Sequence, residues 1–183
     1  MSDAFLHRYL DKTLAPLGAQ LAQRVSANTL TVAAALAGAV ALPEIGYRKY
    51  FFGLGFLVLR CVLDIADGAV ARSRGTTAFG GYLDRLLDLV ITAAVPFAFA
   101  LAEPERALAA MFLLLGLVAR AAASTAVSGD NTPLLVGKSE LFVAFAAACV
   151  FPQWFSIIAY VTGILCFVAA GVRAAQAMTS LRA

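Results

Sequence analysis

Charged side chains are scarce in this sequence: Asp, Glu, Lys and Arg make up 14% of the 183 residues, and hydrophobic residues make up 62%. A soluble domain carries about 25% charged residues and about half apolar ones. The shortage of charge therefore excludes an ordinary soluble domain and predicts an integral membrane protein.

Strong basic charge and paired cysteines are lacking too. The formal net charge is only +3 and the cations are scattered, whereas a nucleic-acid-binding surface needs a clustered basic stripe. The cysteines, Cys61, Cys149 and Cys166, are odd in number, far apart and set in apolar runs, which is typical of reduced, packed thiols. We therefore expect no nucleic-acid partner and no disulfide or zinc framework.

Long apolar runs, by contrast, are abundant. A helix needs roughly 20 apolar residues to cross the hydrocarbon core, and proline and polar turn residues mark the breaks, here at Pro43, 72–79, 103–106, 128–133 and Pro152. The sequence predicts an all-α integral membrane protein. Residues 27–178 would form six transmembrane helices, at about 27–43, 51–70, 80–101, 107–127, 137–151 and 154–175, with the fifth short and 179–183 as a C-terminal tail.

The first 26 residues have a different pattern. Apolar residues recur at intervals of three and four and polar residues fill the gaps, as in an amphipathic helix that lies in the headgroup plane. We predict such a juxtamembrane helix over 1–26, ahead of the six spans. Its charges exclude the apolar core of a cleavable signal peptide, so the N-terminus is expected to be cytoplasmic.

The distribution of Lys and Arg predicts how the chain is oriented. An even number of spans places both termini on one side, which carries seven Lys and Arg residues against three on the other. Cytoplasmic loops carry the excess of Lys and Arg. The termini and the segment 64–88 are therefore expected to face the cytoplasm.

Four aspartates interrupt the apolar runs, at Asp64, Asp67, Asp84 and Asp88. Spacings of three and four place each pair on one helix face, and the short connection predicts antiparallel, neighbouring helices, so all four carboxylates are expected to converge. Because a charged side chain at the bilayer centre costs about 3 kcal/mol and like charges repel, a cation should lie among them. Oxygen ligands without His or Cys suit Mg²⁺ or Mn²⁺ better than zinc.

A magnesium site usually retains waters and binds substrate phosphates, so phosphate chemistry is the leading hypothesis. Gly68, Gly80 and Gly81 lie beside the aspartates and leave room for a ligand to approach the backbone. Arg72 offers a bidentate fork for phosphate. Close packing of helices is the alternative explanation for the glycines.

Together these residues form one pattern, Asp64-x-x-Asp67-Gly68-x-x-Ala71-Arg72 followed by Gly80-x-x-x-Asp84-x-x-x-Asp88. It resembles the signature of the CDP-alcohol phosphotransferase (CDP-alcohol phosphatidyltransferase) family, and the six spans with a preceding surface helix extend the resemblance over nearly the whole chain. One departure is that seven residues separate Arg72 from Gly80, where the family pattern has eight. The shorter loop should not move the acids off their helix faces.

The resemblance implies a phospholipid-synthesising enzyme, usually a homodimer, that transfers a phosphatidyl group from a CDP-linked lipid, such as CDP-diacylglycerol, to an alcohol and releases CMP. Asp64, Asp67 and Asp84 would ligate one or two Mg²⁺ or Mn²⁺ ions, and Asp88 would be the general base and a further metal ligand. The CDP-lipid would contact Asn28, Thr31, Asp64, Gly68, Arg72 and Thr77. For Asn28 and Thr31, a helix N-cap with its neighbouring hydroxyl is an equal alternative.

Three cations in or beside the spans point to the acceptor: Arg120, Lys138 and Arg173. An intramembrane cation normally faces the bundle interior with a partner, and with the acids assigned to metal that partner is expected to be a phosphorylated acceptor. The resemblance to family members that use inositol phosphate or glycerol phosphate implies an acceptor of that kind. Alternatively, Arg173 snorkels to the interface, Lys138 only flanks its span, and the acceptor is unphosphorylated serine or inositol. Arg60 and Arg85 are expected to pair with nearby acids or headgroups.

Two other classes remain as alternatives. An ion-coupled transporter also places acids in spans, but it would spread them through the membrane depth and over repeated halves. An aspartate-rich membrane prenyltransferase would need a second aspartate-rich stretch after Asp88, which the sequence lacks. We therefore expect an enzyme of a bacterial cell membrane with its active site on the cytoplasmic side.

Overall fold

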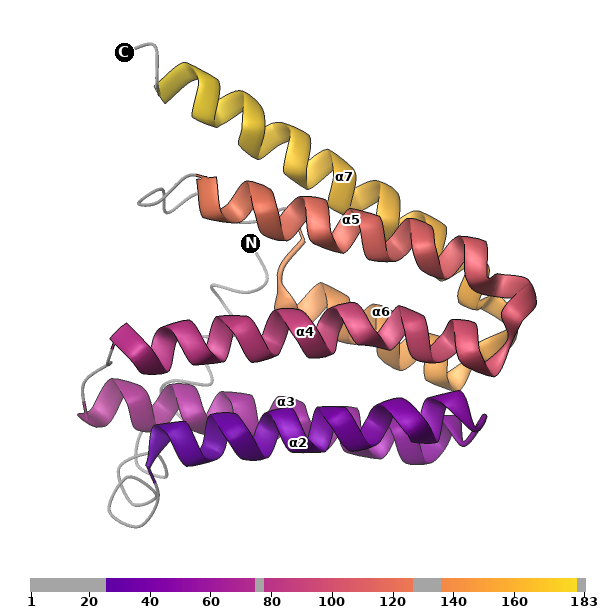
Figure 1. Cartoon of the computed structure of the whole chain (residues 1–183), viewed down its shortest axis with the longest axis horizontal. Helices are drawn as coiled ribbons and strands as arrows, with labels where there is room; N and C mark the ends of the chain where they lie inside the picture. The colour runs from indigo at the N-terminus through magenta and orange to yellow at the C-terminus, as the bar shows by residue number, and fades with distance from the viewer. Residues whose placement is uncertain (1–25, 75–77, 127–135, 181–183) are drawn as a thin grey trace.

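The computed structural model describes residues 26–74, 78–126 and 136–180, which form helices and no strand. Six α-helices run side by side along the long axis of the molecule (Figure 1). Their bounds are α2 Ala27–Gly46, α3 Tyr50–Arg74, α4 Ala78–Ala102, α5 Ala107–Ala126, α6 Lys138–Val150 and α7 Phe155–Ser180, with 3-10 turns at Pro104–Arg106 (η1) and Pro152–Trp154 (η2). The predicted surface helix falls, but for residue 26, outside the described residues.

Among the residues that the structure describes, four segments are long and apolar enough to cross a membrane: Asn28–Gly46, Ala78–Ala102, Pro104–Ser124 and Pro152–Met178. The prediction of six transmembrane spans is therefore corrected to six helices, of which four qualify. Helix α6 has 13 residues and reaches about 20 Å, less than the roughly 30 Å hydrocarbon core. Helix α3, with 25 residues, is long enough, but its apolar sequence is interrupted by Arg60, Asp64 and Asp67.

The helix ends agree with the predicted spans to within five residues, and the largest difference is at the end of α7, predicted at 175 and found at Ser180. Pro43 was expected to mark a connection, but it lies inside α2, which continues to Gly46; membrane helices tolerate such prolines. The reversal follows at 47–49, where Arg48 has a left-handed backbone with φ 63°. The Nε of Arg48 donates to the carbonyl of Ala102 over 2.9 Å, which ties this turn to the end of α4.

Helix α2 packs against both α3 and α4, α5 packs against α4 and α7, and α6 packs against α3. Helices α3 and α4, which carry the acids, make few close contacts with each other. Their backbones are thus held apart, although their side chains meet, as the 2.6 Å pair of Arg60 and Asp88 shows. The short connection 75–77 sets their antiparallel direction, but α2 is the helix that both of them contact (Figure 1).

Small residues allow the closest helix contacts, as is common in membranes. A Cβ on Gly116 of α5 would lie 2.9 Å from the carbonyl oxygen of Gly163 on α7. A Cβ on Gly53 of α3 would lie 2.5 Å from the Cγ1 of Ile45 on α2. The large side chains completely buried between the helices include Ile45, Val95, Leu113, Leu117 and Phe155.

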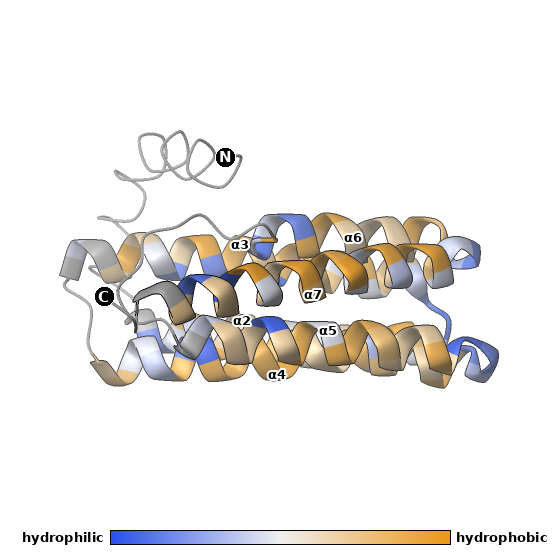
Figure 2. Ribbon diagram, turned by 90° about the horizontal axis from the view of Figure 1, so that it is seen from above, coloured by the Kyte–Doolittle hydropathy of each residue, from blue (hydrophilic) through white to orange (hydrophobic). Residues whose placement is uncertain are grey.

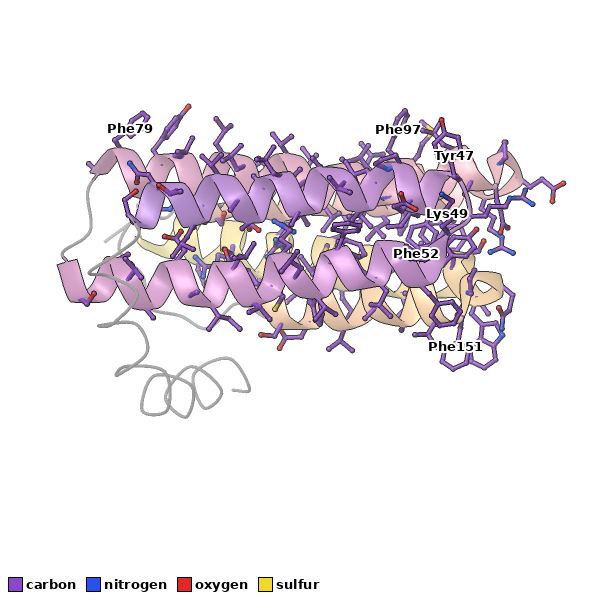
Figure 3. The ribbon with its side chains drawn as sticks, turned by 90° about the horizontal axis from the view of Figure 1, so that it is seen from below. Tyr47, Lys49, Phe52, Phe79, Phe97 and Phe151 are labelled. Carbon is purple, nitrogen blue, oxygen red and sulfur yellow. The ribbon has the colours of Figure 1, made fainter. Side chains whose placement is uncertain are left out.

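The helices are hydrophobic over most of their length, and hydrophilic segments lie at the end with η1 and, in the opposite half of the bundle, as far inward as the start of α6 (Figure 2). Large apolar side chains such as Leu36, Leu108 and Ile164 point outward and are more than half exposed. Exposed aromatic residues mark both ends, with Tyr47, Phe52 and Phe151 at one and Phe79 at the other (Figure 3). An apolar belt between aromatic ends is typical of a protein embedded in a bilayer.

Candidate active site

Three of the four aspartates surround one ammonium group. Lys138, the first residue of α6, places its Nζ 3.5 Å from Asp64 Oδ2, 3.8 Å from Asp84 Oδ2 and 3.5 Å from Asp88 Oδ2. Side chains from α3, α4 and α6 thus meet at one point. Asp64 and Asp88 each lie about ten residues, or about 15 Å of helix rise, from the helix end nearest the connection 75–77.

The fourth aspartate, Asp67, is buried, with 7% of its surface exposed. Its Oδ2 accepts a 2.5 Å hydrogen bond from the hydroxyl of Thr31 on α2. Its Oδ1 is buried and has no hydrogen-bond partner in the part of the chain that the structure describes. A buried carboxylate oxygen without a partner is unfavourable, so a cation that contacts this atom would stabilise it.

Asp88 is also paired with a second cation. The Nη2 of Arg60, on α3, lies 2.6 Å from Asp88 Oδ1, and the two side chains are only 16% and 23% exposed. The sequence-based expectation that Arg60 pairs with a nearby acid is confirmed. Gly38 of α2 lies directly against this arginine, because a Cβ there would be 2.8 Å from Arg60 Cδ.

Two cavities adjoin these carboxylates. The larger, of about 70 Å³, is lined on its polar side by Arg60, Asp64, Asp88, Thr92, Arg120 and Lys138, and on its apolar side by residues of α3 and α6 such as Leu57 and Phe142. The smaller, of about 10 Å³, lies among Thr31, Arg60, Asp64, Asp84 and Asp88. That volume corresponds to about one water-sized sphere.

The donor set fits a hard divalent cation. The smaller cavity offers oxygen donors without His or Cys, as Mg²⁺ and Mn²⁺ prefer, and Asp67 has an oxygen to spare. Within the described ranges, however, no three His, Cys, Asp or Glu side chains are arranged around one metal position. Three of the acids instead lie within 4 Å of the Lys138 ammonium.

The residues predicted to bind the CDP-lipid differ in their burial and in their distance along the chain from the aspartates. Thr31 is buried beside Asp67, whereas Asn28 is exposed in the first turn of α2. The alternative role of Asn28 as N-cap is wrong, because Ser26 caps α2 and its Oγ accepts from the Thr29 N–H at 3.2 Å. Gly68 and Arg72 follow Asp67 on α3, and Thr77 lies outside the described residues.

Gly81 is not explained by close helix packing, since a Cβ on it would meet no atom within 4 Å. Of the three predicted acceptor cations, Arg120 and Lys138 line the larger cavity and Arg173 does not. The Nη1 of Arg120 donates to the carbonyl of Val136 over 3.0 Å, and its buried Nε has no partner among the described residues. The cavity therefore combines carboxylates with a guanidinium that has bonding capacity left.

Comparison with known proteins identifies the family. Residues 24–169 match the family model described as CDP-alcohol phosphatidyltransferase. The chain belongs to the CDP-alcohol phosphatidyltransferase family. The family and enzyme class expected from the aspartate pattern are confirmed, and the transporter and prenyltransferase alternatives are wrong.

Relatives of this CDP-alcohol phosphatidyltransferase come from bacteria and archaea. Inner membrane protein YnjF of Escherichia coli is 32% identical over an alignment that covers 88% of this chain and 90% of the relative. Archaetidylinositol phosphate synthase of Pyrococcus horikoshii is 30% identical over 134 residues, which cover 72% of this chain and 68% of that protein.

Two solved structures of phosphatidylinositol phosphate synthase (PgsA1) of Mycobacterium tuberculosis share the fold. The one with CDP-DAG bound has a TM-score of 0.75 at 20% identity and covers 92% of this chain and 94% of its own. The one in complex with manganese and citrate has a TM-score of 0.74 at 21% identity and covers 90% and 88%.

Proposed function

We propose that this enzyme acts in phospholipid biosynthesis and transfers a phosphatidyl group from CDP-diacylglycerol to a phosphorylated polyol, such as inositol phosphate or glycerol phosphate. The observation that carries the proposal is the larger cavity, which Arg120 and Lys138 line together with Asp64 and Asp88. Guanidinium and ammonium groups are the usual phosphate ligands of proteins, and the relative from Pyrococcus horikoshii is named archaetidylinositol phosphate synthase.

In the proposed reaction, the acceptor hydroxyl attacks the lipid-linked phosphorus of the donor. The bond from that phosphorus to the oxygen of the CMP phosphate breaks, and CMP leaves with the electron pair. Asp88, which borders both cavities, takes the proton of the hydroxyl as general base. The lipid tails of the donor remain in the bilayer beside the apolar outer surface.

Asp64, Asp67 and Asp84, with Asp88 as a further ligand, are proposed to hold one or two Mg²⁺ or Mn²⁺ ions. A bound divalent ion supplies positive charge that neutralises the diphosphate of the donor. The unpartnered Oδ1 of Asp67 and the manganese complex of the structural relative support this assignment. Lys138 would have to release Asp64, Asp84 and Asp88 for these carboxylates to bind metal.

We propose that the donor nucleotide lies along Asn28, Thr31, Gly68, Arg72 and Thr77, next to Asp64. This end of the bundle is proposed to face the cytoplasm, because Arg72 and Arg74 form the end of α3 there and Lys and Arg are enriched in cytoplasmic loops. We also propose a homodimer, as in the family. Crosslinking in native membranes would test the dimer, and labelling of cysteines introduced at either end would test the orientation.

The deciding experiment is CMP release by the purified protein with CDP-diacylglycerol, Mg²⁺ or Mn²⁺, and one acceptor at a time. Inositol phosphate, glycerol phosphate, serine and free inositol separate the possibilities. We expect CMP release with at least one phosphorylated acceptor and none without a divalent ion. Release only with serine or free inositol would overturn the phosphorylated acceptor and leave the family assignment intact.

A further inference from the structure

The ion pair between Arg60 and Asp88 connects two helices whose backbones make few close contacts. Arg60 extends from α3 and Asp88 from α4, with 2.6 Å between Nη2 and Oδ1, although α3 and α4 have few close contacts. A charge-assisted bond of this length between side chains that are mostly buried is stronger than a neutral hydrogen bond. The pair therefore fixes one oxygen of Asp88, and both side chains line the two cavities.

Gly38 leaves room for the Arg60 side chain to reach Asp88. Helix α2 packs against both α3 and α4, and at Gly38 it presents no side chain. A Cβ at this position would lie 2.8 Å from Cδ and 3.2 Å from Nε of Arg60, and 2.6 Å from Cγ2 of Ile91 on α4. These distances are shorter than van der Waals contact, so even an alanine would displace the arginine or the isoleucine.

With Oδ1 bound by Arg60, the second oxygen of Asp88 has a defined direction. Oδ2 lies 3.5 Å from the Lys138 Nζ, and Asp88 borders both cavities. Arg60 therefore orients Asp88, and misplacing a reacting group by about 1 Å can lower a rate about a hundredfold.

We infer that Arg60 is a positioning residue that directs Oδ2 of Asp88 toward the acceptor hydroxyl. Gly38, which has no side chain, leaves the space on α2 that the Arg60 side chain needs to reach Asp88. The inference rests on the proposed role of Asp88 as general base. It assigns to Arg60 an effect on turnover and not on the affinity for either substrate.

The test compares Arg60→Gln, Arg60→Lys and Gly38→Ala with Arg85→Gln, an exposed arginine three residues from Asp88 on α4, as the control. We expect Arg60→Gln to lower kcat by about tenfold or more, the usual effect of losing a partner that orients a ligand or reacting group, with both KM values unchanged. Gly38→Ala should likewise lower kcat and leave both KM values unchanged. Arg60→Lys should have an intermediate kcat, and Arg85→Gln should have wild-type kinetics.

A raised KM for the acceptor with unchanged kcat would overturn the inference and make Arg60 an acceptor ligand. A kcat that falls only in proportion to the folded fraction would also overturn it. Arg60→Lys keeps a cation on α3 and covers the case in which Arg60→Gln does not fold.

A second measurement does not depend on catalysis, so it separates this inference from the proposed function. Melting temperatures of Arg60→Gln, Asp88→Asn and the double variant form a double-mutant cycle. We expect the double variant to lose less than the sum of the two single variants. If the losses of melting temperature are additive, the pairing is overturned, even if the wild type has the proposed activity. If the losses are coupled but the wild type releases no CMP, the pairing stands and only the proposed function is overturned.

Discussion

Thr31 on α2 donates its hydroxyl hydrogen to Oδ2 of Asp67 on α3 over 2.5 Å, and both side chains are buried. The bond joins the two helices at the level of the acid cluster. It also fixes the carboxylate so that Oδ1, which has no partner among the described residues, is the oxygen left for a cation. Thr31 therefore orients a carboxylate that is proposed to bind metal.

The first prediction concerns this bond. Thr31→Val keeps the shape but leaves a second buried carboxylate oxygen unpaired, so we expect a loss of about 1–3 kcal/mol of stability and weaker Mn²⁺ binding. Thr31→Ser retains the hydroxyl and should behave much more like the wild type. Thermal unfolding and Mn²⁺ titration of the purified variants measure both effects, and an unchanged melting temperature in Thr31→Val would refute the role of the bond.

The second prediction concerns Asp88. Asp88→Asn retains an oxygen that can accept from Arg60, but an amide cannot take the proton of the acceptor hydroxyl. We expect CMP release to be abolished while metal-dependent binding of the CDP-lipid remains. Turnover assays and equilibrium binding of CDP-diacylglycerol with Mn²⁺ check the two halves of this statement. Full activity in the variant would remove Asp88 as the base.

The sequence was sufficient for the helices and for the family, for physical reasons. Apolar runs and turn residues locate the elements, and the spacing of Asp64, Asp67, Asp84 and Asp88 encodes which side chains share a helix face. Both are properties of one segment at a time. Accordingly, the helix bounds agree with the predicted spans to within five residues, although Pro43 was mistaken for the end of its helix.

The relations between segments could not be predicted in the same way. A short connection fixes that α3 and α4 are antiparallel, but it does not fix their separation, which depends on α2 packing against both. For the same reason the sequence did not indicate that Lys138 lies among three aspartates. Gly38 gave no signal, because glycines are common in membrane helices and only the packed structure shows what lies against it.

The third prediction concerns Arg120. Its Nη1 is held by the carbonyl of Val136 at 3.0 Å while the side chain borders the larger cavity. If it binds the phosphate of the acceptor, Arg120→Ala should raise the KM for that acceptor by about tenfold, which corresponds to about 1.4 kcal/mol of binding. The KM for CDP-diacylglycerol, measured in the same assay, serves as the internal control. An unchanged KM for the acceptor would exclude Arg120 from the phosphate pocket.

The fourth prediction concerns the contact between α5 and α7. A Cβ on Gly116 would lie 2.9 Å from the carbonyl oxygen and 3.2 Å from the Cα of Gly163. These are backbone atoms, which cannot rotate away, so the two helices would have to separate. We expect Gly116→Ala to destabilise the protein by about 1–3 kcal/mol, as overpacking of a close contact usually does.

Gly171→Ala, on α7 itself, is the matched control, because a Cβ there would meet no atom within 4 Å. In a helix, alanine is favoured over glycine by about 0.5–1 kcal/mol, so this variant should be as stable as the wild type or slightly more stable. Thermal unfolding of both variants in the same detergent measures the difference. If Gly116→Ala were as stable as Gly171→Ala, the α5–α7 contact would be looser than the backbone distances indicate. If both lost stability equally, the effect would come from the loss of glycine and not from the helix contact.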